Sequence, residues 1–594
     1  MSLLTEASLI VTPNGYNVGK LYSVVPNTTL GDMDVVRATS ATRVNSAGLI
    51  EIARTNLVLY SEQFDNASWQ KVGGGIASAP VVTPNVETAP DGTMTADRVF
   101  FTLNGGTSSL DLSSLGSNAF TFTSLTRTQS VYIKTTDGTT RNFSFVSPTG
   151  ISTSITVTSV YQRFTFTVPN GTIVSSTIRL RLRGSASGEG TATSATIAIW
   201  GAQYEEGSVA TEYIPTVASI RTKFAGITQD GSVAQNIPRL DYTGGGCPSI
   251  LAEPARTNLV FYSEQFDNTY WNKSNVTVTA NTTTAPDGTM TADNLNITAT
   301  NGFLRRSSLT FANSTSYTIS IFVKKSATTG TKNFRFYYNN NESSPINSSF
   351  TCLVDLTNIT ATTTASGTIP PTILSTRLVN YNNNWYRVEV AFTTSSLGGN
   401  ATSEIGLQPP SGGPVVDFDA WGAQLEAGAY ATSYIPTTTA TVTRNGDQIS
   451  RANLFTNGIV TASGGTWFME IRNNLVYTRD NSNVNINLDD SSGFNNGFLL
   501  RNTGTGRLSI QKTILGSATF LYLTTTDLTK IAIKWNGVTA DVFANGVKVV
   551  SATAFTTTNL QTILTQMQVP VFINLMALFP TPLTDTQCTQ LTTP

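Results

Sequence analysis

A long internal repeat constrains this chain more than any other feature. The run from Arg54 to Asn66 recurs 202 positions later (256 minus 54) as Arg256 to Asn268, with one difference, Leu59 against Phe261. Two further blocks return in the same order: a Thr-Ala-Pro-Asp-Gly block and a Trp-Gly-Ala-Gln block that runs on to Tyr-Ile-Pro-Thr, at residues 88–97 and 284–293, and at 200–216 and 421–437. Three matched blocks in one order indicate a duplicated domain.

Composition excludes several classes of function. A chain of 594 residues is too long for one hydrophobic core, so we expect several domains. Charged residues make up 12% and the net charge is −1, which leaves no basic surface for nucleic acid. No apolar run approaches the roughly 20 residues of a membrane span, and the N-terminus lacks a signal-peptide pattern. We therefore expect no nucleic-acid binding, no membrane insertion and no ordinary secretion.

Residue types that carry much catalytic and metal chemistry are scarce. The chain has no histidine, which excludes Ser-His-Asp and Cys-His nucleophilic machinery and every zinc site that contains histidine. Cys247, Cys352 and Cys588 are widely scattered along the chain, so they form neither a disulfide framework nor a metal cluster. We expect buried free thiols, no catalytic residues and a protein that is not an enzyme.

Both repeats have the sequence pattern of an all-β fold. Segments of alternating or β-branched residues are separated by Gly, Asn, Ser and Thr turns, for example 130–134, 163–168, 316–323 and 385–392. The second and third blocks begin at 88 and 200 in the first copy, and at 284 and 421 in the second. The second copy is therefore longer between these blocks. We expect its additional residues in loops, around 339–342 and 411–413.

The pattern divides the chain into five segments. These are an N-terminal attachment segment (1–50), a first repeat (51–216), a Pro- and Gly-rich linker or strap (217–255), a second repeat (256–437) and a different C-terminal domain (438–594). Within the last segment, Asn536-Gly537 and Asn545-Gly546 predict a three-strand meander. Thr584 and Gln587 have capping-box spacing and predict a short helix over 585–592.

Three stretches together resemble the modular fibre and spike proteins of tailed bacteriophages. They are the run 239–268, the Ala-Pro-Asp-Gly-Thr motif, and the Trp-Gly-Ala-Gln block with its Tyr-Ile-Pro-Thr extension. The resemblance implies tandem antiparallel β-sandwiches: two jelly rolls similar to carbohydrate-binding modules, and a C-terminal domain similar to concanavalin A-like or laminin G-like lectin domains. It covers residues from about 35 to 594.

The same resemblance implies a function. It predicts a structural protein on the virion surface, a head or tail fibre or a spike, that attaches to host cell-surface polysaccharide and is a homotrimer. The N-terminus would bind other virion proteins. Two alternatives stay open at this point: a head-fibre or decoration protein without a ligand, and a polysaccharide depolymerase with a pair of catalytic carboxylates.

Candidate ligand residues follow from comparing the two copies. Most tryptophans have a counterpart in the other copy, so we expect them in the cores, as we do Trp467 and Trp535 of the C-terminal domain. Aromatic residues without a counterpart, in expected loops, are better candidates for stacking on a sugar. They are Tyr337, Tyr338 and Tyr381.

Acidic residues are the remaining candidates. Glu62 with Asp65, and Glu264 with Asp267, are expected to hydrogen-bond backbone amides rather than to catalyse glycoside hydrolysis. Related jelly rolls often hold a structural calcium ion, and the second copy has Asp417 and Asp419 where the first has none. The resemblance therefore implies calcium in the second repeat, at Asp417 and Asp419, and no other metal or cofactor.

Overall fold

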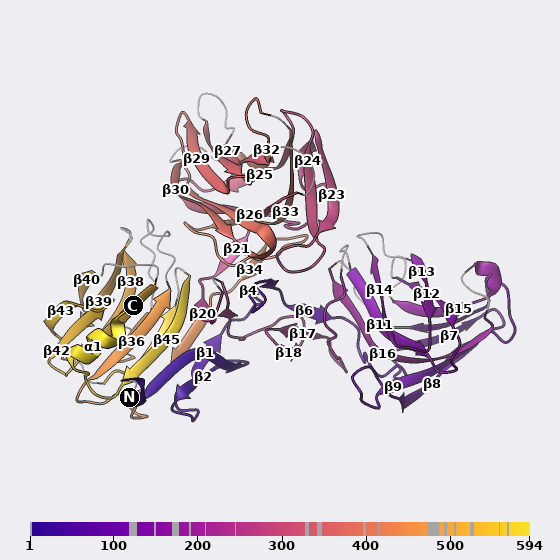
Figure 1. The fold of residues 1–594 in the computed structure, drawn as a ribbon, viewed down its shortest axis with the longest axis horizontal. Coiled ribbons are helices and arrows are strands. Elements are labelled where there is room, and N and C mark those ends of the chain that lie inside the picture. The colour runs from indigo at the N-terminus through magenta and orange to yellow at the C-terminus, as the bar shows by residue number, and fades with distance from the viewer. Residues whose placement is uncertain are drawn as a thin grey trace. The chain divides into compact units, whose positions relative to one another are not determined.

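A computed structural model describes the fold, and the strands in it pair antiparallel (Figure 1). Of the residues described, only Asp585–Thr592 form an α-helix, so the predicted all-β class of tandem antiparallel β-sandwiches is confirmed. The described residues are 3–117, 127–147, 150–168, 177–188, 192–207, 209–243, 245–326, 332–340, 347–395, 400–413, 415–472, 486–491, 496–503, 507–522, 528–556, 559–566 and 570–594.

The chain forms two compact units. One unit contains Met1–Ile52, Gln235–Gly288 and Ala292–Pro594; the other contains Ala53–Ala234 with Thr289–Thr291. We call them the large and the small unit. This partition does not test the predicted five-segment division, which stays a prediction.

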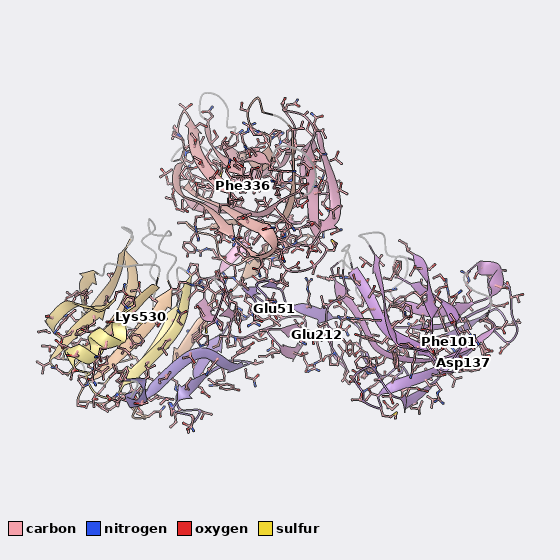
Figure 2. All side chains as sticks on the ribbon, viewed as in Figure 1. Glu51, Phe101, Asp137, Glu212, Phe336 and Lys530 are labelled. Carbon is pink, nitrogen blue, oxygen red and sulfur yellow. The ribbon has the colours of Figure 1, made fainter. Side chains whose placement is uncertain are left out.

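The small unit is a sandwich of two five-stranded sheets with a three-stranded sheet beside it. Aromatic and aliphatic residues fill the space between the sheets, among them Phe101, labelled in Figure 2, which packs edge-on against Phe143. In sheet order the strands are β13 (Ser152–Val157), β12 (Arg141–Val146), β15 (Arg179–Arg183), β10 (Leu112–Gly116) and β7 (Gln70–Gly74); β14 (Gln162–Val168), β11 (Arg127–Thr135), β16 (Ser194–Glu206), β9 (Ala96–Thr102) and β8 (Ser78–Glu87); and β18 (Ile227–Asp230), β17 (Arg221–Phe224) and β6 (Arg54–Asn56).

The large unit contains the second sandwich, of two six-stranded sheets. Phe336, labelled in Figure 2, lies in its core. The strands are β22 (Asn272–Ser274), β25 (Phe303–Phe311), β32 (Asn400–Gln408), β27 (Asn333–Asn340), β28 (Ser348–Asp355) and β29 (Thr360–Gly367); and β23 (Val276–Thr283), β24 (Ala292–Ile297), β33 (Val416–Ala427), β26 (Ser316–Lys325), β31 (Trp385–Thr393) and β30 (Thr372–Asn380). A short pair, β21 (Arg256–Asn258) with β34 (Val442–Arg444), joins the start of this repeat to the segment after it.

The two sandwiches differ by one pair of strands, and this corrects the prediction that the additional residues of the second copy form loops. Sheet order matches β13 to β28 and β14 to β31, whereas β29 and β30 have no partner in the described part of the first copy. They continue the two sheets at the same end, one strand to each. Residues 360–367 are Thr-rich and 372–380 mix apolar and polar residues, compositions that suit half-exposed edge strands. Residues 341–342 of the predicted loop lie outside the described residues.

A third sandwich, also in the large unit, is built on one long sheet path. The path folds over on itself, because Phe498 of β38 contacts Trp535 of β41 with ring centroids 5.9 Å apart. In order it runs β40 (Ser517–Tyr522), β39 (Arg507–Ile514), β38 (Gly497–Thr503), β37 (Ile486–Asp489), β44 (Thr562–Gln566), β35 (Gln448–Arg451), β3 (Met33–Val36), β2 (Lys20–Val25), β1 (Leu9–Asn17), β45 (Val571–Phe579), β36 (Gly465–Arg472), β41 (Leu528–Trp535), β42 (Thr539–Ala544) and β43 (Val547–Ala554).

The N-terminal strands are part of this third sandwich. Within the predicted attachment segment (1–50), β1 pairs with β45 and β3 pairs with β35. Leu9, Val11 and Leu21 are fully buried in the same core as Trp467. These short apolar strands have too little core of their own to fold alone, and they complete a sheet that the C-terminal segment leaves open.

Two short hairpins precede the two repeats, and both belong to the large unit. They are β4 (Arg43–Val44) with β5 (Ile50–Glu51), and β19 (Leu240–Asp241) with β20 (Ser249–Ala252). β20 also pairs with Val571–Ile573, so β1 and β20 share one edge of β45. We call the segments that hold these hairpins the first linker (residues 42–53) and the second linker (residues 217–255), and the second linker is joined to the third sandwich by strand pairing.

Local predictions for the C-terminal domain are confirmed. β41, β42 and β43 form the predicted meander, and Gly537 and Gly546 have the positive φ that these tight turns require. Helix α1 (Asp585–Thr592) begins with the predicted capping box between Thr584 and Gln587. No helix in the described part of the chain is long and apolar enough to cross a membrane.

Candidate ligand-binding site

The three repeated blocks bond to one another in each copy. Asn56 of the first block donates from Nδ2 to the carbonyl of Ala202 in the third block (3.0 Å) and to that of Ile214 (2.8 Å). Asn258 makes the equivalent two bonds in the second copy. Buried polar groups need such partners, so the blocks recur together because they form one structural junction.

The repeated acids belong to this junction. Glu62 accepts a hydrogen bond from the hydroxyl of Tyr213 (3.0 Å), and Glu264 accepts one from Tyr434 (2.9 Å). Each glutamate thus bonds a tyrosine hydroxyl, a partner that the sequence did not predict. Burial raises the pKa of Glu62. Both glutamates hold the Tyr-Ile-Pro-Thr segment in place.

A further acid in each copy went unnoticed in the sequence. Asp293 closes the second block, and its two carboxylate oxygens accept hydrogen bonds from the backbone amides of Phe266 (2.8 Å) and Asn281 (3.0 Å). Burial raises the pKa of Asp293 to about 7. Asp97 makes the matching bonds in the first copy. Each aspartate ends a block that is identical in the two copies, and this identity was the sequence signal that could have identified it.

Two of the three candidate tyrosines are not in loops. Tyr337 and Tyr338 lie on β27, where they are 6% and 1% exposed, and Tyr338 is part of the sandwich core. The prediction of a loop position is wrong because the aromatic run at 334–338 pairs on both sides, with β28 and β32. A side chain so deeply buried presents no face for stacking on a sugar.

The calcium candidates lie together but do not fit calcium. Asp417 and Asp419 project from one face of β33, and the Nδ2 group of Asn294 donates to one oxygen of each (3.0 Å). Lys332 donates to the backbone carbonyl of Asp417 (2.9 Å), and the positive charge of Lys324 acts on Asp419. Calcium takes six to eight oxygen ligands, whereas an amide N–H and lysines face these carboxylates. Among the described residues no group of three or more His, Cys, Asp or Glu side chains could hold a metal.

The third candidate, Tyr381, lines a cavity in the large unit. The cavity encloses about 80 Å³, and we call it the β30 cavity after the strand that supplies Arg377 and Val379 and leads directly into Tyr381. Its other walls come from five stretches of the same unit: the two hairpins before the repeats, β31, the segment after β33, and the start of β45 with the residue before it. The residues concerned lie within 42–50, 241–253, 387–389, 431–434 and 570–572.

Charged side chains form one wall of the β30 cavity. Arg377 donates from Nη1 to Oε2 of Glu389 across 3.2 Å, and Nη1 of Arg387 lies 3.8 Å from Oε1 of the same carboxylate. Burial raises the pKa of Tyr381 to about 12. Asp241 lines the cavity too and accepts hydrogen bonds from the backbone amides of Val44 and Thr243 (2.8 Å each).

Aromatic and apolar groups form other parts of the wall. Phe572 lies half-buried at the start of β45, with the guanidinium of Arg472 4.5 Å from its ring centroid. Tyr381 packs edge-on against Phe322, with centroids 5.0 Å apart. Pro570, two residues before Phe572 along the chain, also lines the cavity. Each aromatic ring is therefore held in place by a neighbour from its own part of the large unit.

The cavity combines scaffold residues with residues found in one copy. Arg387 is scaffold: it donates to the carbonyl of Thr432 and the hydroxyl of Ser320, as Arg163 does to Thr211 and Ser130. Arg377 and Tyr381 depend on β30, which has no counterpart in the described part of the first copy. Glu389 stands two residues after Arg387, whereas the equivalent position in the first copy, two residues after Arg163, is Thr165. Sequence comparison could find Tyr381, but not the charged pair that β30 and β31 bring to it.

A fully buried ion cluster adjoins the cavity through Glu253, which belongs to both. Glu253, which lines the cavity, accepts from Arg239 and Arg444 at 2.7 Å each, and Asp447 accepts from Arg37 at 2.6 Å and also from Arg239. Burial alone would raise the pKa of Glu253 and Asp447, but the neighbouring arginines outweigh it and lower the pKa of each to about 2. The cluster ties the N-terminal segment, the second linker and the segment after the second repeat together.

Comparison with known proteins assigns no family. No protein-family model matches the chain, and no curated protein matches it. Among solved structures, it aligns with the CBM22-1–CBM22-2 tandem domain of Paenibacillus barcinonensis Xyn10C at 12% identity and TM-score 0.21, over 66% of this chain and all of that one. Mouse laminin alpha1 domains LG4-5 align at 10% identity and TM-score 0.15, over 48% and 92%. Trypanosoma rangeli sialidase aligns at 8% identity and TM-score 0.19, over 100% and 97%. At these TM-scores the alignments carry no argument about this chain.

Proposed function

We propose that this chain is a non-enzymatic structural protein on the surface of a tailed-bacteriophage particle, a fibre or spike, and that it attaches the particle to host-surface glycan. The β30 cavity would be the attachment site. The observation that carries the proposal is the meeting of Tyr381 and Phe572 with the Arg377–Glu389 pair in one cavity. Sugar sites combine an apolar ring surface with a few converging polar groups.

The remainder of the molecule suits a surface protein. Tandem sandwiches of Thr-, Ser- and Asn-rich strands present polar exposed faces around hydrophobic cores. We further propose a homotrimer, because three weak single sites on one particle would bind a repetitive polysaccharide far more strongly than one. Attachment to other virion proteins through the N-terminal strands is part of the same proposal; these strands would bind as part of the third sandwich.

Binding of the purified full chain to an array of bacterial surface polysaccharides tests the function. The full chain is needed because β1–β3 complete the C-terminal sandwich. We expect specific binding that Phe572→Ala abolishes. Phe100→Ala is the matched control, since Phe100 is an exposed aromatic residue (43%) of the small unit, outside the cavity, and its removal is expected to leave binding unchanged.

The other outcomes favour the rival functions. Absence of binding to every polysaccharide would support a decoration protein without a ligand. Release of oligosaccharide during incubation would support a depolymerase, and Asp241 and Glu389 would then be the carboxylates to replace first, because both line the cavity.

A further inference from the structure

We propose that the β30 cavity takes a single, neutral, terminal sugar of the host glycan, and that Arg377 and Glu389 bind two neighbouring hydroxyl groups of that sugar. This inference rests on the proposed function, since it names the ligand class of the same site. It goes further in stating which part of a glycan enters and which chemical feature is recognised.

The pairing of Arg377 with Glu389 provides the recognition. Nη1 of Arg377 and Oε2 of Glu389 lie 3.2 Å apart at the cavity wall, so a donor and an acceptor stand side by side. A hydroxyl group can both donate and accept. Two adjacent hydroxyls can therefore accept from the guanidinium and donate to the carboxylate at once, in charge-assisted hydrogen bonds. An isolated hydroxyl would have to serve both groups from one oxygen, whereas two adjacent hydroxyls can serve one group each.

Charge balance favours a neutral sugar over an acidic one. The arginines at the wall already have partners: Arg377 bonds Glu389, Arg43 bonds Glu51 (2.8 Å), and Arg387 bonds a carbonyl and a hydroxyl. Asp241 and Glu389 both face the cavity. The carboxylate of an acidic sugar would meet these negative charges and compete with Glu389 for Arg377, which costs binding energy.

The size of the cavity favours one terminal unit. A space of about 80 Å³ corresponds to roughly six water-sized sites, which suits the polar edge of one ring and not a continuous chain. Phe572 and Tyr381 give the ring apolar surface to contact. Arg472 holds Phe572, and Phe322 holds Tyr381, so both surfaces are in position before the ligand arrives.

Competition on the wild-type full chain tests the ligand class without any variant. Polysaccharide binding is competed with the methyl glycosides of glucose, galactose and mannose, with their single-deoxy analogues and with the methyl glycosides of the matching uronic acids. We expect one neutral sugar to compete best, and removal of either of two adjacent hydroxyls to weaken it roughly 10- to 100-fold. Stronger competition by a uronic acid, or no loss with any deoxy analogue, would overturn the proposal.

Variants then locate the recognised pair. We expect Arg377→Ala and Glu389→Gln each to weaken binding roughly tenfold or more, and each to make the deoxy analogue that lacks its own hydroxyl partner compete as well as the parent sugar. Arg98→Ala is the matched control, because Arg98 pairs with Glu87 on the surface of the small unit at 2.6 Å. Wild-type binding that both cavity variants retain would overturn this inference while leaving the attachment function intact. No binding by the wild type would remove the proposed function itself.

Discussion

Arg239 donates from Nη1 to Oε2 of Glu253 across 2.7 Å with both side chains buried, and Arg43 and Glu51 form the same kind of pair at 2.8 Å in the hairpin before the first repeat. Glu51, labelled in Figure 2, keeps a quarter of its side chain exposed. The duplication thus includes an arginine–glutamate pair in each linker. In the second linker the pair is enclosed by Arg37, Arg444 and Asp447 and becomes the centre of the buried cluster.

Replacing Glu253 is expected to destabilise the large unit severely. Glu253→Gln leaves Arg239 and Arg444 buried without their shared carboxylate, and breaking a buried pair costs about 3–5 kcal/mol. Unfolding in urea, followed by tryptophan fluorescence, measures the loss. Glu51→Gln is the matched control at the equivalent position and should cost only about 0–1 kcal/mol, because its pair is partly exposed to solvent. Equal losses in the two variants would contradict the role of the cluster.

Acid is expected to unfold the large unit through the same cluster. The folded-state pKa of Glu253 and of Asp447 is lowered to about 2, below the unfolded values near 4. The stabilisation is therefore fully present above about pH 4 and is lost as the pH falls towards 2. Circular dichroism from pH 5 to pH 2 should show a cooperative loss of structure. A transition in the Glu253→Gln variant as steep as in the wild type would exclude this origin.

The buried carboxyl group of Asp293 is expected to make folding stability depend on pH in the opposite direction, at higher pH. Burial raises its folded-state pKa to about 7, above the unfolded value near 4, so its contribution to stability falls as the pH rises from 4 to 7. For one such group, the free energy of unfolding changes by at most about 1.4 kcal/mol per pH unit. The chain has no histidine, which keeps this window free of histidine titration. Melting temperatures between pH 4 and 8 should fall with pH in the wild type, and Asp293→Asn should flatten that dependence.

Removing the N-terminal strands is expected to prevent the C-terminal sandwich from folding. Residues 438–594 alone leave open the edges of β45 and β35 that β1 and β3 cover, and expose the core that Leu9 and Val11 fill. We expect this fragment to be insoluble, and co-expression with residues 1–38 to restore soluble protein. Residues 53–234, which have a core of their own, should be soluble alone. A folded, monomeric 438–594 fragment would show that β1–β3 are dispensable.

Short-range features of the fold were within reach of sequence reasoning. The Asn-Gly turns and the capping box act between near neighbours in the chain, so their outcome depends on local chemistry. Comparison of the copies predicted core positions for most tryptophans, the same was expected of Trp467 and Trp535 in the C-terminal domain, and all seven are buried. Of the cysteines, Cys352 and Cys588 are buried as expected, whereas Cys247 in the Gly-rich strap is exposed.

The sequence by itself determined the duplication, the all-β class and the absence of histidine chemistry, because each is a property of composition, period or local pairing. Only the tertiary structure decided that β1–β3 complete a sandwich built mainly from strands after Gln448, and that β29 and β30 extend the second copy. The same holds for the β30 cavity, which collects Tyr381, Phe572 and the Arg377–Glu389 pair from distant segments. The sequence of an edge strand does not identify the strand that pairs with it, because backbone hydrogen bonds are alike in every pairing. Register and partner are set by burial of one face, which exists only once the chain has folded.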